Sequence, residues 1–111
     1  MWDGFSVLYP MVIKEGSKYL MWYTGTAGIS YKIGIATSDD GITWERIKEN
    51  PIDFGRVHSF HPWVIKDKAG YRLWYSIKES PKTGFKIGSA YSKDGIKWEI
   101  KKEALKSNLG W

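Results

Sequence analysis

Histidine is the side chain best suited to proton transfer near neutral pH, and this sequence has two of them. His58 and His61 lie three residues apart in the segment His58-Ser59-Phe60-His61-Pro62. An imidazole in this segment could act as a general acid or base, or as a hydrogen-bond partner. The following proline predicts an extended conformation for His61. On an extended strand the two rings point to opposite sides, so we expect no shared metal site unless the backbone bends.

The most conspicuous carboxylates belong to two copies of a Ser-x-Asp-Gly-x-x-Trp pattern. One copy contains Asp40 and Trp44, and the other contains Asp94 and Trp98. In such a turn the Asp accepts backbone hydrogen bonds, the Gly permits a positive φ, and the Trp packs beneath the hairpin. The pattern therefore predicts structural turns, and we do not expect the adjacent Asp39 and Asp40 to form a catalytic pair.

The elements that position these residues follow from an internal repeat. Seventeen residue types recur in order, first at an offset of 52 residues and then at an offset of 54. The matches run from Pro10 to Glu45 in the first copy and from Pro62 to Glu99 in the second. The change of offset places two extra residues between the second and third strands of the second copy.

Each copy is predicted to form four short strands separated by turns that contain glycine. The expected strands are residues 8–14, 19–24, 32–38 and 43–47, then 60–66, 71–76, 86–92 and 97–101. An antiparallel unit of about 50 residues with four strands has the size of one propeller blade. The second strands carry aromatic and apolar residues on both faces, which neighbouring blades would cover. We therefore predict an all-β fold of two four-stranded antiparallel blades, with an eight-stranded sandwich or barrel as the alternative.

The repeat also predicts how the chain is organised and how it assembles. Residues 1–111 form one unit, with blade one at 2–50, blade two at 51–102, and a linker towards a next blade at 103–111. Because a propeller ring needs about four to eight blades, two blades cannot close it. The uncovered aromatic faces favour self-association, with a six-bladed trimer preferred and a four-bladed dimer as the alternative.

Composition excludes several classes of function. The 111 residues allow one small domain, and the absence of cysteine excludes disulfides and thiolate metal clusters. The net charge of +5 is spread along the chain, which argues against nucleic-acid binding. No run of about 18 apolar residues could form a membrane helix, and the N-terminus lacks a signal-peptide pattern, so the location stays unknown with the cytoplasm as the default. We expect no cofactor, because phosphate-cradling loops, nucleophile elbows and metal-ligand clusters are missing.

The motifs together resemble a known group of proteins. The pattern Pro-x-Val-Ile-Lys, Tyr-x-x-Trp-Tyr-Thr-Gly and Lys-Ile-Gly-Ile-Ala-Thr-Ser-Asp-Asp-Gly-Ile-Thr-Trp-Glu resembles blades of the glycosidase-like five-bladed propellers. These include relatives of the arabinanases, xylosidases, invertases and levansucrases, with the mannoside phosphorylases close by. The resemblance covers residues 2–111, two blades of the five, and is specific for the fold rather than for one activity. The Ser-x-Asp-Gly turns resemble a shortened Asp-box of the sialidases.

The resemblance implies a central funnel to which different blades contribute carboxylates. Many members carry an Asp directly before the proline of the first strand, but this chain has Tyr9 and His61 there. Whether this chain is an enzyme is therefore left open. Asp3 resembles a Trp-Asp motif of some relatives and is the leading candidate carboxylate, with a turn-capping role as the alternative. His61 is the second candidate catalytic residue, or a partner for a sugar hydroxyl, with a hydrogen-bonded polar residue that lines a water-filled channel as the alternative.

Four residues are candidates for substrate binding on the funnel side: Tyr9, His58, Trp63 and Glu79. Trp63 stands where the first copy has Met11, so the blade itself does not require it. The favoured function is a glycoside hydrolase-like propeller unit that interacts with carbohydrate. The alternatives are a lectin-like carbohydrate-binding oligomer, or a catalytically inactive assembly unit of a larger propeller.

Overall fold

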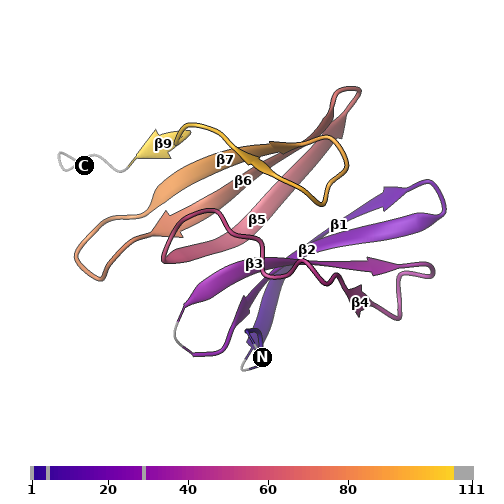
Figure 1. Cartoon of the computed structure of the whole chain (residues 1–111), viewed down its shortest axis with the longest axis horizontal. Coiled ribbons are helices and arrows are strands. Elements are labelled where there is room, and N and C mark those ends of the chain that lie inside the picture. The colour runs from indigo at the N-terminus through magenta and orange to yellow at the C-terminus, as the bar shows by residue number, and fades with distance from the viewer. Residues whose placement is uncertain (1, 5, 29, 107–111) are drawn as a thin grey trace.

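The chain forms two antiparallel β-sheets in a computed structural model that describes residues 2–4, 6–28 and 30–106 (Figure 1). The first sheet has the order β1 (Ser6–Glu15), β2 (Lys18–Thr26), β3 (Tyr31–Ser38), β4 (Glu45–Arg46). The second has the order β5 (His58–Asp67), β6 (Gly70–Lys78), β7 (Lys86–Ser92), β8 (Glu99–Ile100), and β9 (Leu105–Lys106) also pairs with β7. No helix in these residue ranges is long and apolar enough to cross a membrane.

The predicted all-β architecture of two four-stranded antiparallel sheets is confirmed, while several strand limits differ. The first strand of each copy is longer than predicted, at Ser6–Glu15 and His58–Asp67. The fourth strands are shorter, at Glu45–Arg46 and Glu99–Ile100. Within the predicted linker, β9 adds to the second sheet, and residues 107–111 lie outside the described part of the chain.

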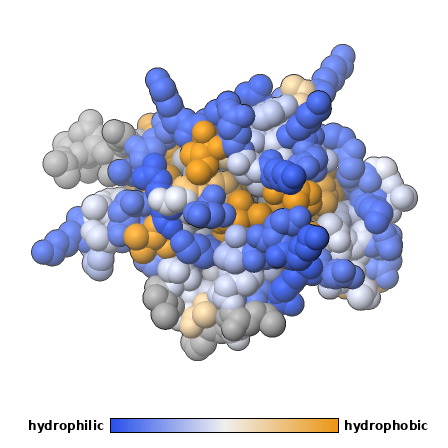
Figure 2. All heavy atoms as spheres, in the orientation of Figure 1, coloured by the Kyte–Doolittle hydropathy of each residue, from blue (hydrophilic) through white to orange (hydrophobic). Residues whose placement is uncertain are grey.

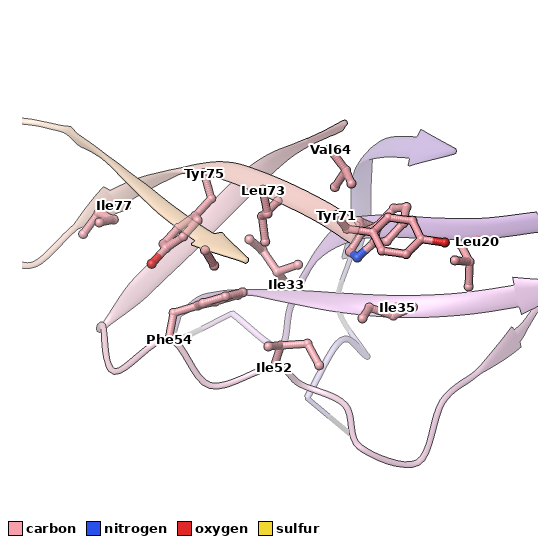
Figure 3. Packing of buried hydrophobic residues seen from close by; sticks show 12 residues of the cluster. Leu20, Ile33, Ile35, Ile52, Phe54, Val64, Tyr71, Leu73, Tyr75 and Ile77 are labelled. Atoms are coloured by element: carbon pink, nitrogen blue, oxygen red, sulfur yellow. The ribbon is translucent and has the colours of Figure 1, made fainter. Parts of the chain in front are cut away.

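The two sheets stack in the manner of successive blades. The first sheet contributes Ile33 and Ile35 to the shared core, and the second contributes Leu73 and Tyr75 (Figure 3). Trp22 of the first sheet belongs to the same core. Leu73 is the repeat equivalent of Met21, the residue before Trp22, so Trp22 and Leu73 point from opposite faces of their blades. We call the face that carries Trp22 or its equivalent Trp74 the back of a blade, and the face that carries Met21 or Leu73 its front. The back of blade one therefore packs on the front of blade two. A sandwich built from two equivalent faces would instead bury matching positions, so the stacking fits propeller blades.

A short segment between the sheets completes this core. Ile52 pairs with Ile33 of β3, and Phe54 stacks on Tyr75 with ring centroids 4.4 Å apart. Trp2 is the repeat equivalent of Phe54 and stacks on Tyr23 in the same way, at 5.7 Å. Each blade therefore receives an aromatic ring from the segment that precedes it, on the same second-strand tyrosine.

The Ser-x-Asp-Gly turns have the hydrogen bonds expected of structural turns. The carboxylate of Asp40 accepts hydrogen bonds from the amides of Ile42 and Thr43 at 2.8 and 2.9 Å. Asp94 does the same for Ile96 and Lys97 at 2.9 and 3.0 Å. Gly41 has φ of 77°, a left-handed conformation that glycine adopts readily. The carboxylates are thus engaged in ordering their turns.

These turns predict a loss of stability in acid. Hydrogen bonds from Thr43 and Ile42 hold the pKa of Asp40 below its usual value, and those from Lys97 and Ile96 do the same for the pKa of Asp94. A carboxylate whose pKa is lower in the folded state than in the unfolded state stabilises the fold when it is ionised. This stabilisation is complete above the unfolded pKa of about 3.9, and it is lost as the pH falls through the folded pKa.

We expect the free energy of unfolding, measured by urea titration, to fall as the pH is lowered below about 4. Asp40→Asn and Asp94→Asn should flatten that fall, because the amide oxygen still accepts hydrogen bonds but does not titrate. The matched control is Asp39→Asn, because the Asp39 side chain is exposed and forms a surface ion pair with Lys18. An equal flattening by Asp39→Asn would contradict this account.

Candidate functional site

A β-bulge interrupts the first strand of each blade at the same place in the repeat. Leu8 faces Thr24 and Met11 faces Trp22, so Tyr9 and Pro10 together oppose one residue of β2. Phe60 and Trp63 bracket the same irregularity in β5. Pro lacks the N–H that a regular ladder would use, and a bulge is a place where a strand tolerates it.

The first residue of each bulge has a left-handed backbone. Tyr9 has φ of 54° and His61 has φ of 57°. The prediction that Pro62 holds His61 extended is therefore wrong, because the bulge geometry overrides the steric preference of a residue before proline. Residues other than glycine rarely adopt positive φ, and such strain concentrates at functional sites.

The two bulges bring Tyr9 and His61 together. Their rings stack with centroids 4.5 Å apart and an angle of 22° between the ring planes. The backbone amide of His61 donates a hydrogen bond of 2.7 Å to the hydroxyl of Thr24, which is fully buried in β2. This bond ties the bulge of blade two to blade one. The result is an exposed aromatic pair on the first strands of both blades, which we call the bulge pair.

Substitutions at His61 test the energetic consequence of its left-handed backbone. We expect His61→Gly to be more stable than His61→Ala by about 1 kcal/mol, because alanine is strained at positive φ and glycine is not. At Trp63, two residues along the same strand, the order should reverse, with glycine less stable than alanine by about 0.5–1 kcal/mol. Chemical denaturation of the four variants measures both differences. The same order at both positions would contradict the bulge geometry.

His58 is held apart from the bulge pair. Its Nδ1 atom accepts a hydrogen bond of 3.1 Å from the amide of Tyr31, and the two rings lie 5.7 Å apart. Tyr31 also contacts Phe60, which contacts Phe85 in turn. These four side chains form an aromatic strip across both blades, beside the loops that join the second and third strands. The two histidines therefore contact different aromatic partners, although the backbone does bend at His61.

Trp63 and Glu79 also lie away from the bulge pair. Trp63 is 60% exposed, on the face of blade two that points away from blade one. Its repeat equivalent Met11 packs against the core between the blades. The carboxylate of Glu79 lies 3.7 Å from the guanidinium of Arg56, which also forms a 2.8 Å ion pair with Glu103. Glu79 is thus part of an ion-pair network.

Asp3 is buried in blade one, and its side chain is held by two donors. Its Oδ2 atom accepts hydrogen bonds from the Tyr23 hydroxyl at 2.9 Å and from Nε of Arg46 at 2.7 Å. Burial alone would raise the pKa of Asp3, but the hydrogen bonds of Arg46 and Tyr23 and the charge of Arg46 outweigh it and lower the pKa. Burial and the hydrogen bond to Asp3 raise the pKa of Tyr23 to about 12. This geometry suits a structural ion pair better than proton transfer to a ligand.

Metal binding finds no support in the part of the chain that the structure describes. No group of three or more His, Cys, Asp or Glu side chains there could hold a metal ion. His58 and His61 lie three residues apart in the sequence, but their rings contact Tyr31 and Tyr9, respectively.

Sequence reasoning missed three contributors to this surface. Thr24 anchors the bulge of blade two, and its repeat partner Ser76 is also a hydroxyl residue, which is the signal that could have pointed to it. Phe60 and Phe85 extend the aromatic strip. Their signal was weaker, because Phe85 falls in the loop where the two copies differ in length.

Comparison with solved structures supports the blade arrangement. An exo-1,5-alpha-L-arabinanase from a bovine ruminal metagenomic library superposes with a TM-score of 0.72 at 25% identity, covering 91% of this chain and 36% of that one. A thermostable family-43 glycoside hydrolase gives 0.66 at 26% identity, covering 97% and 40%. The native arabinanase of Bacillus subtilis gives 0.70 at 22% identity, covering 95% and 40%. The chain therefore has the fold of propeller blades.

More specifically, the chain is related in fold to the glycosidase-like propellers, as the sequence motifs predicted. Two uncharacterized proteins of Mycobacterium tuberculosis are each 29% identical over an alignment 113 positions long, which covers 89% of this chain. The chain spans 38% of the length of these two relatives. No family model matches it.

Proposed function

We propose that the chain is a two-blade unit of a glycosidase-like propeller that binds carbohydrate at the bulge pair. The observation that carries this proposal is the stacking of Tyr9 and His61 from two left-handed bulges on neighbouring first strands. Strained residues in equivalent positions of both blades are costly to keep without a function. In propellers of this type the first strands line the central funnel, so the pair would face a ligand there.

The chemistry of the bulge pair suits a sugar. An exposed aromatic ring offers a flat apolar surface for the C–H face of a pyranose or furanose, and its polar tip can bind a hydroxyl. Tyr9 supplies a phenol and His61 an imidazole, which can donate to or accept from sugar hydroxyls. The aromatic strip of Tyr31, His58, Phe60 and Phe85 would extend this surface for a longer oligosaccharide.

Hydrolysis by this unit alone is not part of the proposal. Glycoside hydrolysis uses two carboxyl groups about 5–9.5 Å apart on either side of the scissile bond. The two positions before the first-strand prolines carry Tyr9 and His61, and Asp3 is engaged by Arg46 and Tyr23. Binding without turnover is therefore the better supported activity, and the arabinanase neighbours make 1,5-linked arabino-oligosaccharides the first ligands to try.

The unit would act as an oligomer. Two copies supply four blades and three supply six, and the trimer is favoured over the dimer as the closed ring. A ring of copies would repeat the bulge pair around one funnel, and such repeated sites increase avidity for a long glycan. This assembly would correspond to the lectin-like alternative. An assembly that binds no sugar would correspond to an inactive unit of a larger propeller.

Calorimetric titration with an arabino-oligosaccharide tests the binding site. We expect Tyr9→Ala to weaken binding about tenfold, the effect of losing one aromatic stacking contact. Ile42→Ala is the matched control, because Ile42 is highly exposed in the turn at the opposite end of the strands. Unchanged affinity in Tyr9→Ala would exclude the bulge pair. Wild-type protein that binds none of arabino-, xylo-, fructo- or manno-oligosaccharides would exclude the function itself.

A further inference from the structure

The contact between the two blades leaves one face of each blade open. Blade one uses its back, with Trp22 and Ile33, and blade two uses its front, with Leu73 and Tyr75. The front of blade one and the back of blade two are thus the same two kinds of surface, and the contact between these two blades does not cover them. Figure 2 shows apolar side chains in the middle of the view, where the two sheets meet, with hydrophilic side chains around them.

The back of blade two keeps part of the apolar character of the back of blade one. Ile33 is fully buried between the blades, and its equivalent Ile87 is 38% exposed. Ile13 packs against the core, and its equivalent Ile65 is 48% exposed. Together with the exposed Trp63, these residues offer a surface of the kind that buries itself inside the chain.

The front of blade one matches the front of blade two. Val64 is 1% exposed between the blades, and its equivalent Val12 is 43% exposed. Beside it lies an apolar groove of about 320 Å³ that is lined in part by Met21, Ala36 and Trp44. Met21 and Ala36 are the repeat equivalents of Leu73 and Ala90, which pack against blade one.

Charged groups repeat on the same surfaces. Within the chain, Glu15 of blade one forms an ion pair with Lys66 of blade two and accepts a 3.0 Å hydrogen bond from the Tyr71 hydroxyl. Lys66 lies 5.7 Å from the centre of the Tyr71 ring, and Lys14 lies 5.7 Å from the Tyr19 ring in the same arrangement. Asp67 is the repeat equivalent of Glu15 and is exposed at the end of β5, where its carboxylate forms a surface ion pair with Arg72 at 3.2 Å.

We propose that a second copy of this chain covers these faces, with the back of blade two of one copy seated on the front of blade one of the next. In this head-to-tail contact Ile65 and Trp63 would cover Val12 and the groove. Asp67 of one copy would take the place of Glu15 beside Lys14 and Tyr19 of the other. Such a heterologous contact continues from copy to copy until the ring closes. The inference rests on the proposed oligomer and names the surface that forms it.

Light scattering on a sizing column tests the contact. We expect wild-type protein to have a mass of two or three times 12.8 kDa. Ile65→Glu should reduce it to the mass of one chain at the same concentration, because an uncompensated charge would enter the apolar contact. Lys14→Glu should do the same by facing Asp67 with a like charge. Lys48→Glu is the matched control, because it makes the same charge change on an exposed side chain outside these faces.

Near-ultraviolet circular dichroism keeps this test separate from misfolding, since a dissociated but folded variant retains the aromatic signal of the shared core. Wild-type protein that stays at the mass of one chain at every concentration would overturn the proposal, as would an Ile65→Glu variant that keeps the wild-type mass. A monomer that still binds an oligosaccharide would contradict the contact between copies and support the binding function. An oligomer that binds no sugar would support the contact between copies and contradict the binding function.

Discussion

Replacing Trp22 with alanine should destabilise the chain by about 3–5 kcal/mol, the range for removing a large aromatic side chain from a core. Trp22 is fully buried, and its ring lies 5.8 Å from Tyr71 and 6.2 Å from Trp98 of the other blade. The cavity would open where the two blades meet, so both sheets should lose stability together. Urea unfolding followed by circular dichroism measures the change.

The repeat supplies a matched control for this experiment. Trp74 occupies the same strand position in blade two, but it lies on the open back face and is only partly buried. We expect Trp74→Ala to cost about 1 kcal/mol when the protein is dilute enough to be monomeric. Equal costs for the two substitutions would mean that the blades do not stack back to front. A larger cost for Trp74→Ala at high concentration would instead report the contact between copies.

Asp3→Ala is the second substitution with a large expected effect, a loss of about 3 kcal/mol at neutral pH. The change removes two charge-assisted hydrogen bonds, and each such bond contributes about 1.5–3 kcal/mol. The bond from Arg46 contributes at the lower end, because the Arg46 side chain is half exposed and water screens its charge. The Tyr23 hydroxyl, which is buried beneath Trp2, would lose its acceptor. Thermal unfolding of wild type and variant gives the difference.

The pH dependence of this difference separates the ion pair from simple loss of packing. Because the pKa of Asp3 is lowered in the folded protein, its stabilisation is complete above the unfolded pKa and disappears as the pH falls through the folded value. The gap between wild type and Asp3→Ala should therefore shrink below about pH 4. Asp53→Ala is the control, because Asp53 is an exposed linker carboxylate that accepts one backbone hydrogen bond. A gap that does not depend on pH would contradict the ion pair.

The sequence predicted the blades well because their information is local and repeated. The alternation of strands and glycine turns, together with the two offsets, was enough to predict four strands in each copy. The Asp40 and Asp94 turns were also predictable, since every hydrogen bond in them joins residues two or three positions apart.

The site was harder to predict because its contacts cross the chain. The pairing of Asp3 with Arg46 joins residues far apart in sequence, and their repeat equivalents are Gly55 and Ile100, so the repeat gives no hint of it. The left-handed backbone of His61 contradicts the usual preference before proline and depends on strand register and on Thr24 of the other blade. The repeated Tyr-Pro and His-Pro pairs marked the place but not its conformation.

The central claim, that the bulge pair binds carbohydrate, is tested most directly by nuclear magnetic resonance of the two histidine rings during titration with a 1,5-linked arabino-oligosaccharide. We expect a saturable shift of the resonances of the His61 ring, which stacks on Tyr9, and loss of that shift in Tyr9→Ala. The His58 ring accepts a hydrogen bond from Tyr31 in the aromatic strip, so it should shift only when the oligosaccharide is long enough to reach that strip. Saturable binding that leaves the His61 ring unchanged would contradict the account.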